Sequence, residues 1–199
     1  MKTIQEHRRP GNPSTAETAI DRYVTVFSRL VDDLDRAAIL EVVDLLRVAR
    51  AHGRTVYIAG NGGSAAIATH FVNDLGKATR AAGGFRALCL SDNVSWLTAL
   101  ANDEGFERVF TGQLENFASP GDVLIVISAS GNSPNILEAV EFARKQGMLS
   151  VGLLGFDGGR VKDLVDRAVW VETEKGEYGV VETVHALVCD LITTCLAEE

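Results

Sequence analysis

The chain carries two kinds of hydrophobic pattern, one after the other. Near the start, apolar side chains recur at three- and four-residue spacing, as at Ile20, Tyr23, Val24 and Phe27, and again over residues 36–51. This spacing gathers the apolar side chains on one face of a helix. The first part of the chain is therefore expected to form two consecutive helices.

From residue 55 onward, short runs of consecutive apolar residues alternate with helical patterns. A run such as VLIVI at 123–127 is typical of a strand that helices cover on both faces. Strands are predicted over 55–60, 85–91, 122–129, 150–156 and 168–173, and helices over 64–79, 106–117, 133–146 and 178–196. This order predicts an α/β fold, a doubly wound five-stranded parallel sheet with two helices in front.

Length and composition suit one compact domain. The chain has 199 residues, of which 46% are hydrophobic, enough to bury a core without disulfides or metals. Residues 1–13 hold Pro10, Gly11 and Pro13 with few apolar side chains, so we expect a flexible tail there. Residues 14–199 would then form a single domain that includes the first two helices.

Net charge and cysteine content limit which ligands, macromolecules and metal sites are expected. The net charge is −8 and the basic pair Arg8–Arg9 has no continuation, so no direct binding to nucleic acid is expected. No apolar run reaches the roughly 18–20 residues of a membrane span, and the start lacks the apolar core of a secretory signal. A cytoplasmic protein without a membrane partner is expected. Its three cysteines include no CxxC pair, which disfavours a disulfide framework or a thiolate zinc site.

Two loops rich in glycine and serine follow predicted strands. They read GNGGS at 60–64 and SASGNS at 128–133. Ligands of doubly wound sheets bind at the carboxyl ends of the strands, where such loops lie. Glycine lets the backbone approach a ligand, while serine hydroxyls and helix N-termini donate hydrogen bonds to phosphate without side-chain charge. The pair of loops predicts a crevice for a small phosphorylated ligand.

Two alternatives to this phosphate site remain open. Each loop could be an ordinary strand-to-helix connection with serine as the helix cap. Gly60, Gly62 and Ala65 also satisfy the G-x-G-x-x-A dinucleotide fingerprint. The second alternative requires an acidic residue about 20 residues after the fingerprint, at the end of the next strand. The candidate, Asp92, comes 27 residues after Ala65 and so fits this requirement poorly. No nucleotide cofactor is therefore expected.

Candidate acid–base groups lie on two predicted helices. His70 and Asp74 are four residues apart and share a helix face, where they could bind a metal, pass a proton or form a simple surface pair. The last helix carries Glu182, His185 and Asp190 among apolar residues, so these polar groups should be buried or lie at an interface. His185 is interpreted as a core histidine.

Several of these segments together resemble a known family. They resemble the SIS (sugar isomerase) domains, and among them the sedoheptulose-7-phosphate isomerase, or phosphoheptose isomerase, group. The resemblance runs from about residue 16 to the C-terminus, through GNGGSAAIATHF, SDNVSWLTALANDEGF, ISASGNSPNILEAVEFARKQGM, GFDGG and ETVHALVCDL. It implies a flavodoxin-like sheet with an N-terminal helical hairpin, and a homotetramer whose active sites lie at subunit interfaces.

The resemblance also implies which residues bind substrate. The family's phosphate contacts fall on Ser64, Ser128, Ser130 and Ser133. Further substrate contacts fall on Asn61, Gly62, Gly63, Asn102, Asp103, Ala129 and Glu182. Ala129 stands where these isomerases usually have threonine, so a hydroxyl that could orient the substrate is missing.

The family's metal and proton-handling positions fall on the two helices described above. Matching them residue by residue gives His70, Asp74, Glu182 and Asp190, of which only His70 is identical to the usual His, Glu, Gln and His. These four would hold one divalent cation, zinc, per subunit. Asp74 and Asp190 would handle the protons, and Glu182 would assist them.

The implied reaction converts sedoheptulose 7-phosphate to D-glycero-D-manno-heptose 7-phosphate through an enediol. Such an aldose–ketose isomerisation needs an acid and a base and no redox cofactor. Two alternatives remain at this stage. One is a binding module without catalysis, such as the SIS adaptor that binds a bacterial replication initiator, and the other is an isomerase of a different phosphosugar.

Overall fold

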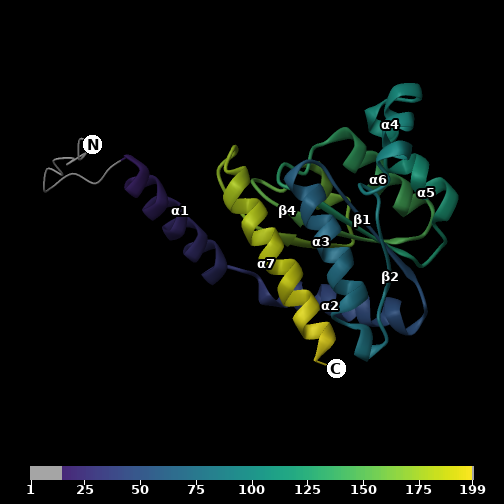
Figure 1. Ribbon diagram of the computed structural model, residues 1–199, viewed down its shortest axis with the longest axis horizontal. Coiled ribbons are helices and arrows are strands. Elements are labelled where there is room, and N and C mark those ends of the chain that lie inside the picture. Colours follow the sequence, from purple (N-terminus) through teal and green to yellow (C-terminus); the bar gives the residue numbers. More distant parts are fainter. Residues whose placement is uncertain (1–14, 199) are drawn as a thin grey trace, which may run out of the picture.

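The protein forms a three-layered α/β structure around a parallel sheet (Figure 1). The computed structural model describes residues 15–198. Its strands follow the order β2-β1-β3-β4-β5, and every neighbouring pair is parallel. The strands are β1 (Thr55–Gly60), β2 (Arg86–Cys89), β3 (Val123–Ser128), β4 (Leu149–Leu154) and β5 (Arg167–Trp170). The predicted doubly wound, flavodoxin-like sheet is confirmed.

Within residues 15–198, seven α-helices and three short 3₁₀ turns connect and cover the strands. The α-helices are α1 (Thr15–Asp32), α2 (Arg36–Ala51), α3 (Gly63–Lys77), α4 (Val94–Asp103), α5 (Thr111–Phe117), α6 (Pro134–Lys145) and α7 (Tyr178–Ala197). The 3₁₀ turns are η1 (Arg80–Ala82), η2 (Phe106–Arg108) and η3 (Arg160–Asp163). The expected tail at 1–13 and Ser14 lie outside the described residues.

Alternate residues of the central strand enter two separate cores. Val123, Ile125 and Ile127 of β3 pack with α2, α3 and α7, whereas Leu124 and Val126 pack with α4, α5 and α6. All of these side chains are fully buried. This explains the uninterrupted apolar run of β3, because a strand covered on both faces has no position for a polar side chain.

One helix was not predicted, and another proved to be divided. α4 buries only Leu100, and its Val94 is 68% exposed, so it lacks the full apolar stripe by which helices are found. The structure does show a start signal, since the Asn93 side chain accepts a hydrogen bond from the Trp96 N–H at 3.1 Å. The helix predicted over 106–117 is split into η2 and α5.

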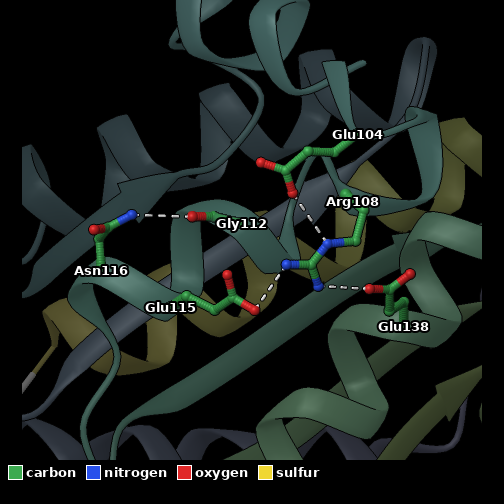
Figure 2. Close-up of polar contacts among 6 residues, drawn as sticks. All are labelled: Glu104, Arg108, Gly112, Glu115, Asn116 and Glu138. Carbon is green, nitrogen blue, oxygen red and sulfur yellow. Dashed lines mark hydrogen bonds and ion pairs between the residues drawn. The ribbon is translucent and has the colours of Figure 1, made fainter. Parts of the chain in front are cut away.

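An arginine fastens this divided region to α6. The Arg108 guanidinium donates to Glu115 and Glu138 at 2.8 Å each and to Glu104 at 3.4 Å (Figure 2). Hydrogen bonds with Glu138 and Glu115 raise the pKa of Arg108 above its ordinary value. The cluster ties together the end of α4, η2, α5 and α6.

The last helix, α7, is the central helix of one of the two helical layers. α7 packs against α1, α2 and α3, and α1 extends away from the sheet (Figure 1). Among residues 15–198, α7 is the one helix long and apolar enough to cross a membrane, with half of its apolar window buried, as in a core helix. α1 is tied to it through the Tyr23 hydroxyl, which donates to the Gly179 carbonyl at 2.9 Å.

Candidate functional site

The two glycine- and serine-rich loops converge on one pocket. In the sheet, Gly60 of β1 pairs with Ile127 of β3, so both chains leave adjacent strands at the same edge. Between them lies a pocket of about 130 Å³. It is lined by Asn61, Ser64, Ile127, Ser128, Ala129, Ser130, Ser133, Tyr178 and Glu182. The predicted crevice is therefore present, with all four candidate phosphate-binding serines in its wall.

Two helices begin at this pocket. α3 starts after Gly62, whose φ of 55° is a left-handed conformation that glycine adopts without a Cβ penalty. α6 starts with Pro134 in its first turn and Ser133 as its N-cap residue. The first N–H groups of a helix have no partner inside it and carry partial positive charge. Both helices thus present hydrogen-bond donors at the same place.

Backbone contacts orient the serine hydroxyls of the second loop. The Ser128 hydroxyl oxygen accepts a hydrogen bond from the Gly131 N–H at 3.1 Å, and the Ser130 hydroxyl oxygen accepts one from the Asn132 N–H at 3.3 Å. A hydroxyl whose oxygen already accepts in this way retains its own hydrogen for donation. These two serines are therefore prepared to donate to an anion in the pocket.

Ala129 lies in a small apolar cluster at the pocket wall. Its methyl group packs with Phe156 and Val181, and the residue is 5% exposed. Phe156 itself has a φ of 49° and stacks edge-on against Tyr178, with 5.0 Å between the ring centroids. An apolar contact thus occupies the position where the resemblance leads us to expect a threonine hydroxyl.

Three of the four candidate metal ligands come together where α3 and α7 pack against each other. One ligand atom each of His70, Asp74 and Asp190 lies within 4.8 Å of the others, and His70 Nε2 is 3.0 Å from Asp74 Oδ2. One imidazole and two carboxylates are a donor set that a divalent cation accepts. Glu182 is outside this triad and lies in the pocket wall, where its carboxylate faces the Cα of Gly63.

His185 lies in the core and faces no solvent. It is 0% exposed, and neither ring nitrogen has a well-oriented hydrogen-bond partner within residues 15–198. Burial lowers its pKa to about 4, an effect that the Leu154 carbonyl partly offsets. The imidazole is therefore neutral at pH 7. This agrees with its interpretation as a core histidine, although its hydrogen-bonding capacity is unsatisfied.

Two of the expected substrate contacts lie elsewhere in this subunit. Asn102 and Asp103 end α4, are exposed and are bonded to each other at 2.7 Å. They do not line the pocket.

The structure also places next to the pocket a residue that the sequence pattern did not indicate. Asn135 is 1% exposed and exchanges two amide hydrogen bonds with Asn61, a pairing that no local pattern could indicate.

Comparison with known proteins identifies the family. The SIS domain family matches residues 21–155. A phosphoheptose isomerase from Trichlorobacter lovleyi is 40% identical over 174 residues, which cover 85% of this chain and 88% of the relative. The chain belongs to the phosphoheptose isomerase family. Another family member, from Nitratiruptor, is 42% identical over 146 residues, which cover 73% of this chain and 77% of that protein.

Solved structures agree with this assignment. The phosphoheptose isomerase from Neisseria gonorrhoeae superposes with a TM-score of 0.83 at 27% identity, over 92% of this chain and 97% of that one. The Vibrio vulnificus NanR protein, solved with ManNAc-6P, superposes with a TM-score of 0.67 at 17% identity, over 94% of this chain and 63% of NanR. The second match shows the shared fold alone. Membership of the SIS domains and of the phosphoheptose isomerase family is thus confirmed.

Proposed function

We propose that this protein is an aldose–ketose isomerase that interconverts sedoheptulose 7-phosphate and D-glycero-D-manno-heptose 7-phosphate. The observation that carries the proposal is the single pocket formed by Ser64, Ser128, Ser130 and Ser133 together with the carboxylate of Glu182. The relatives named phosphoheptose isomerase, which align over most of their length, support the substrate class.

The phosphate group would occupy the serine end of the pocket. None of the described residues that line it is a lysine or an arginine. Binding would instead use the serine hydroxyls and the N-termini of α3 and α6, which bind anions through N–H groups and their dipoles. Burying the phosphate among fixed donors orients the sugar relative to the carboxylates on α3 and α7.

The carboxylates would carry out the proton transfers. The reaction moves a proton between C1 and C2 through an enediol, which requires a base at carbon and an acid at oxygen. We assign this pair to Asp74 and Asp190, with Glu182 contacting the sugar between them and the phosphate. Glu182 and Asp190 are eight residues apart on α7, which corresponds to about 12 Å along a helix axis. An extended sugar phosphate would therefore lie along α7.

His70, Asp74 and Asp190 would also hold a divalent cation, and zinc is the proposed metal. When bound, a cation at this place would act as a Lewis acid toward substrate oxygens. The protein's own contribution is to keep the two carboxylates next to each other and next to His70.

We further propose a homotetramer in the cytoplasm. α1 projects from the body of the subunit (Figure 1). Its Ile20, Tyr23 and Val24 are 62, 43 and 55% exposed. An apolar helix face of this kind is typical of an interface. A neighbouring subunit could then bring Asn102 and Asp103 to the pocket, which they do not reach within their own subunit.

The decisive assay incubates the purified protein with sedoheptulose 7-phosphate, with and without zinc, and measures the aldose product. We expect turnover in the wild type, and loss of turnover with retained sugar-phosphate binding in Asp74→Asn and in Asp190→Asn. Unchanged turnover in either variant would refute the assignment of the proton-handling pair. Ligand-induced thermal stabilisation of the wild type without any product would indicate a phosphosugar-binding module instead.

A further inference from the structure

A reciprocal amide pair joins the two loops of the pocket. Asn61, in the first loop, donates from Nδ2 to Asn135 Oδ1 at 3.0 Å. Asn135, in the first turn of α6, donates from Nδ2 to Asn61 Oδ1 at 2.9 Å. The two residues are 74 positions apart in the chain, so the pair is a direct link between the starts of α3 and α6.

Asn135 lies behind the pocket wall, where it can contact Asn61 but not a ligand bound in the pocket. It is 1% exposed and is not one of the residues that line the pocket, whereas Asn61 is. Its Oδ1 also accepts a hydrogen bond from the Ile136 N–H at 3.0 Å, which fixes the side chain to its own helix. Asn135 is therefore held rigidly behind the wall that Asn61 forms.

The same pair limits what Asn61 can do for the sugar. A side-chain amide has two N–H donors and one carbonyl oxygen, and one donor and the oxygen of Asn61 are already engaged by Asn135. Paired amides in a buried setting are costly to separate, because each would leave unsatisfied polar atoms. Asn61 thus keeps one N–H for a ligand in the pocket that it lines, while its other N–H and its oxygen are held by Asn135.

We infer that Asn135 is a positioning residue, which acts through Asn61 to hold the two anion-binding helix N-termini at one fixed separation. A phosphate needs donors from both loops at once, and misplacing donors by about 1 Å can cost up to about a hundredfold in rate. The inference rests on the proposed phosphate pocket and extends it with a residue that does not contact substrate.

The test compares phosphate affinity in matched variants. The variants are Asn135→Ala, Asn135→Leu, Asn61→Ala and the double alanine variant. Asn116→Ala is the control, because Asn116 also donates one amide hydrogen bond, to the Gly112 carbonyl at 3.1 Å (Figure 2). Asn116 lies on α5, and no residue of α5 lines the pocket. The Kd for inorganic phosphate is measured by calorimetry well below each variant's Tm, together with KM and kcat for sedoheptulose 7-phosphate.

We expect the Kd for phosphate to rise about tenfold in Asn135→Ala, as for the loss of one buried hydrogen bond. Asn61→Ala should show a similar rise, and the double variant should be no weaker than either single one, because the pair acts as a unit. KM should rise more than kcat falls. Asn116→Ala should leave Kd and KM unchanged.

Wild-type phosphate affinity in both Asn135 variants would overturn the inference, as would effects of Asn61→Ala and Asn135→Ala that multiply in the double variant. Asn135→Leu keeps the branched shape of the side chain at a larger volume and leaves no cavity, so it remains informative if Asn135→Ala does not fold. A wild-type protein that binds phosphate and shows no turnover would refute the proposed reaction and leave this comparison intact.

Discussion

Gly131 offers the sharpest test of how the second loop is built. Its φ is 59°, and a Cβ added there would lie 2.7 Å from the Gly158 carbonyl carbon and closer still to its oxygen. The left-handed conformation costs a residue with a Cβ about 1–2 kcal/mol. The overlap with backbone, which cannot rotate away, adds about 1–3 kcal/mol. Gly131→Ala should therefore destabilise the protein by about 2–5 kcal/mol.

Gly53 provides the matched control. It has a φ of 63°, yet a Cβ added there would meet no atom within 4 Å. Gly53→Ala should therefore cost only the conformational penalty of about 1–2 kcal/mol. Urea denaturation gives both free energies of unfolding, and thermal melts should show about 2–4 °C of Tm per kcal/mol for a chain of this size.

Ligand binding distinguishes the two glycines further. The Gly131 N–H donates to Ser128 Oγ, and the Gly131 carbonyl accepts from the Val161 N–H at 3.0 Å. Displacing Gly131 would disturb the serine that the pocket needs, so we expect phosphate affinity to fall about tenfold or more. Gly53→Ala should leave it unchanged. Equal loss of stability in the two variants, with phosphate affinity retained in both, would refute this reasoning.

Three further predictions concern single side chains. His185→Leu should flatten the pH dependence of stability, because the unfolded histidine takes up a proton below about pH 6.5 while the native one, with a pKa of about 4, stays neutral. Between pH 7 and pH 5 the free energy of unfolding, measured by urea denaturation, should therefore fall by about 2 kcal/mol more in the wild type than in the variant. Equal falls in the two proteins would contradict this. Arg108→Met should lower the free energy of unfolding by about 1–2 kcal/mol, whereas Arg167→Met, which breaks one exposed ion pair, should lower it by less than about 0.5 kcal/mol. The difference between the two variants should shrink in about 0.5 M salt. Equal losses would show that the Arg108 cluster adds nothing to stability. Gly63→Ala should place a Cβ against the Glu182 carboxylate, which can move aside, so we expect a lower kcat with an unchanged or higher Tm; unchanged kcat would argue that the position of Glu182 does not matter.

The sheet could be predicted because its signal is local. Strands such as β3 are apolar at every position before the final Ser128, and the helices on either side have apolar faces, so type and order follow from the pattern alone. α4 was missed because it buries little more than Leu100. The predicted ends of the helices over 64–79, 133–146 and 178–196 lie within two residues of those of α3, α6 and α7, whereas the last predicted strand ends at residue 173, three residues beyond the end of β5.

The site was predictable only in part. Because parallel strands end at one edge, two loops that follow adjacent strands must meet, and the serines could be placed together from sequence. Strand order decides which distant residues touch, so the Asn61–Asn135 pair could not be foreseen. The eight-residue spacing on α7 already separates Glu182 from Asp190 by about 12 Å along the helix axis. Spacing could not show that Asp190 would meet His70 and Asp74, because that depends on where α7 crosses α3.

The all-neutral lining of the serine end has a consequence for how substrate reaches the enzyme. A chain of net charge −8 repels a doubly charged phosphate at long range, and the described residues that line the pocket include no lysine or arginine to compensate. Added electrolyte screens that repulsion over about 10 Å at 0.1 M ionic strength, while the short-range hydrogen bonds inside the pocket are affected little. Capture of the substrate should therefore become faster, not slower, as ionic strength rises, the reverse of an enzyme that attracts anions with a positively charged funnel.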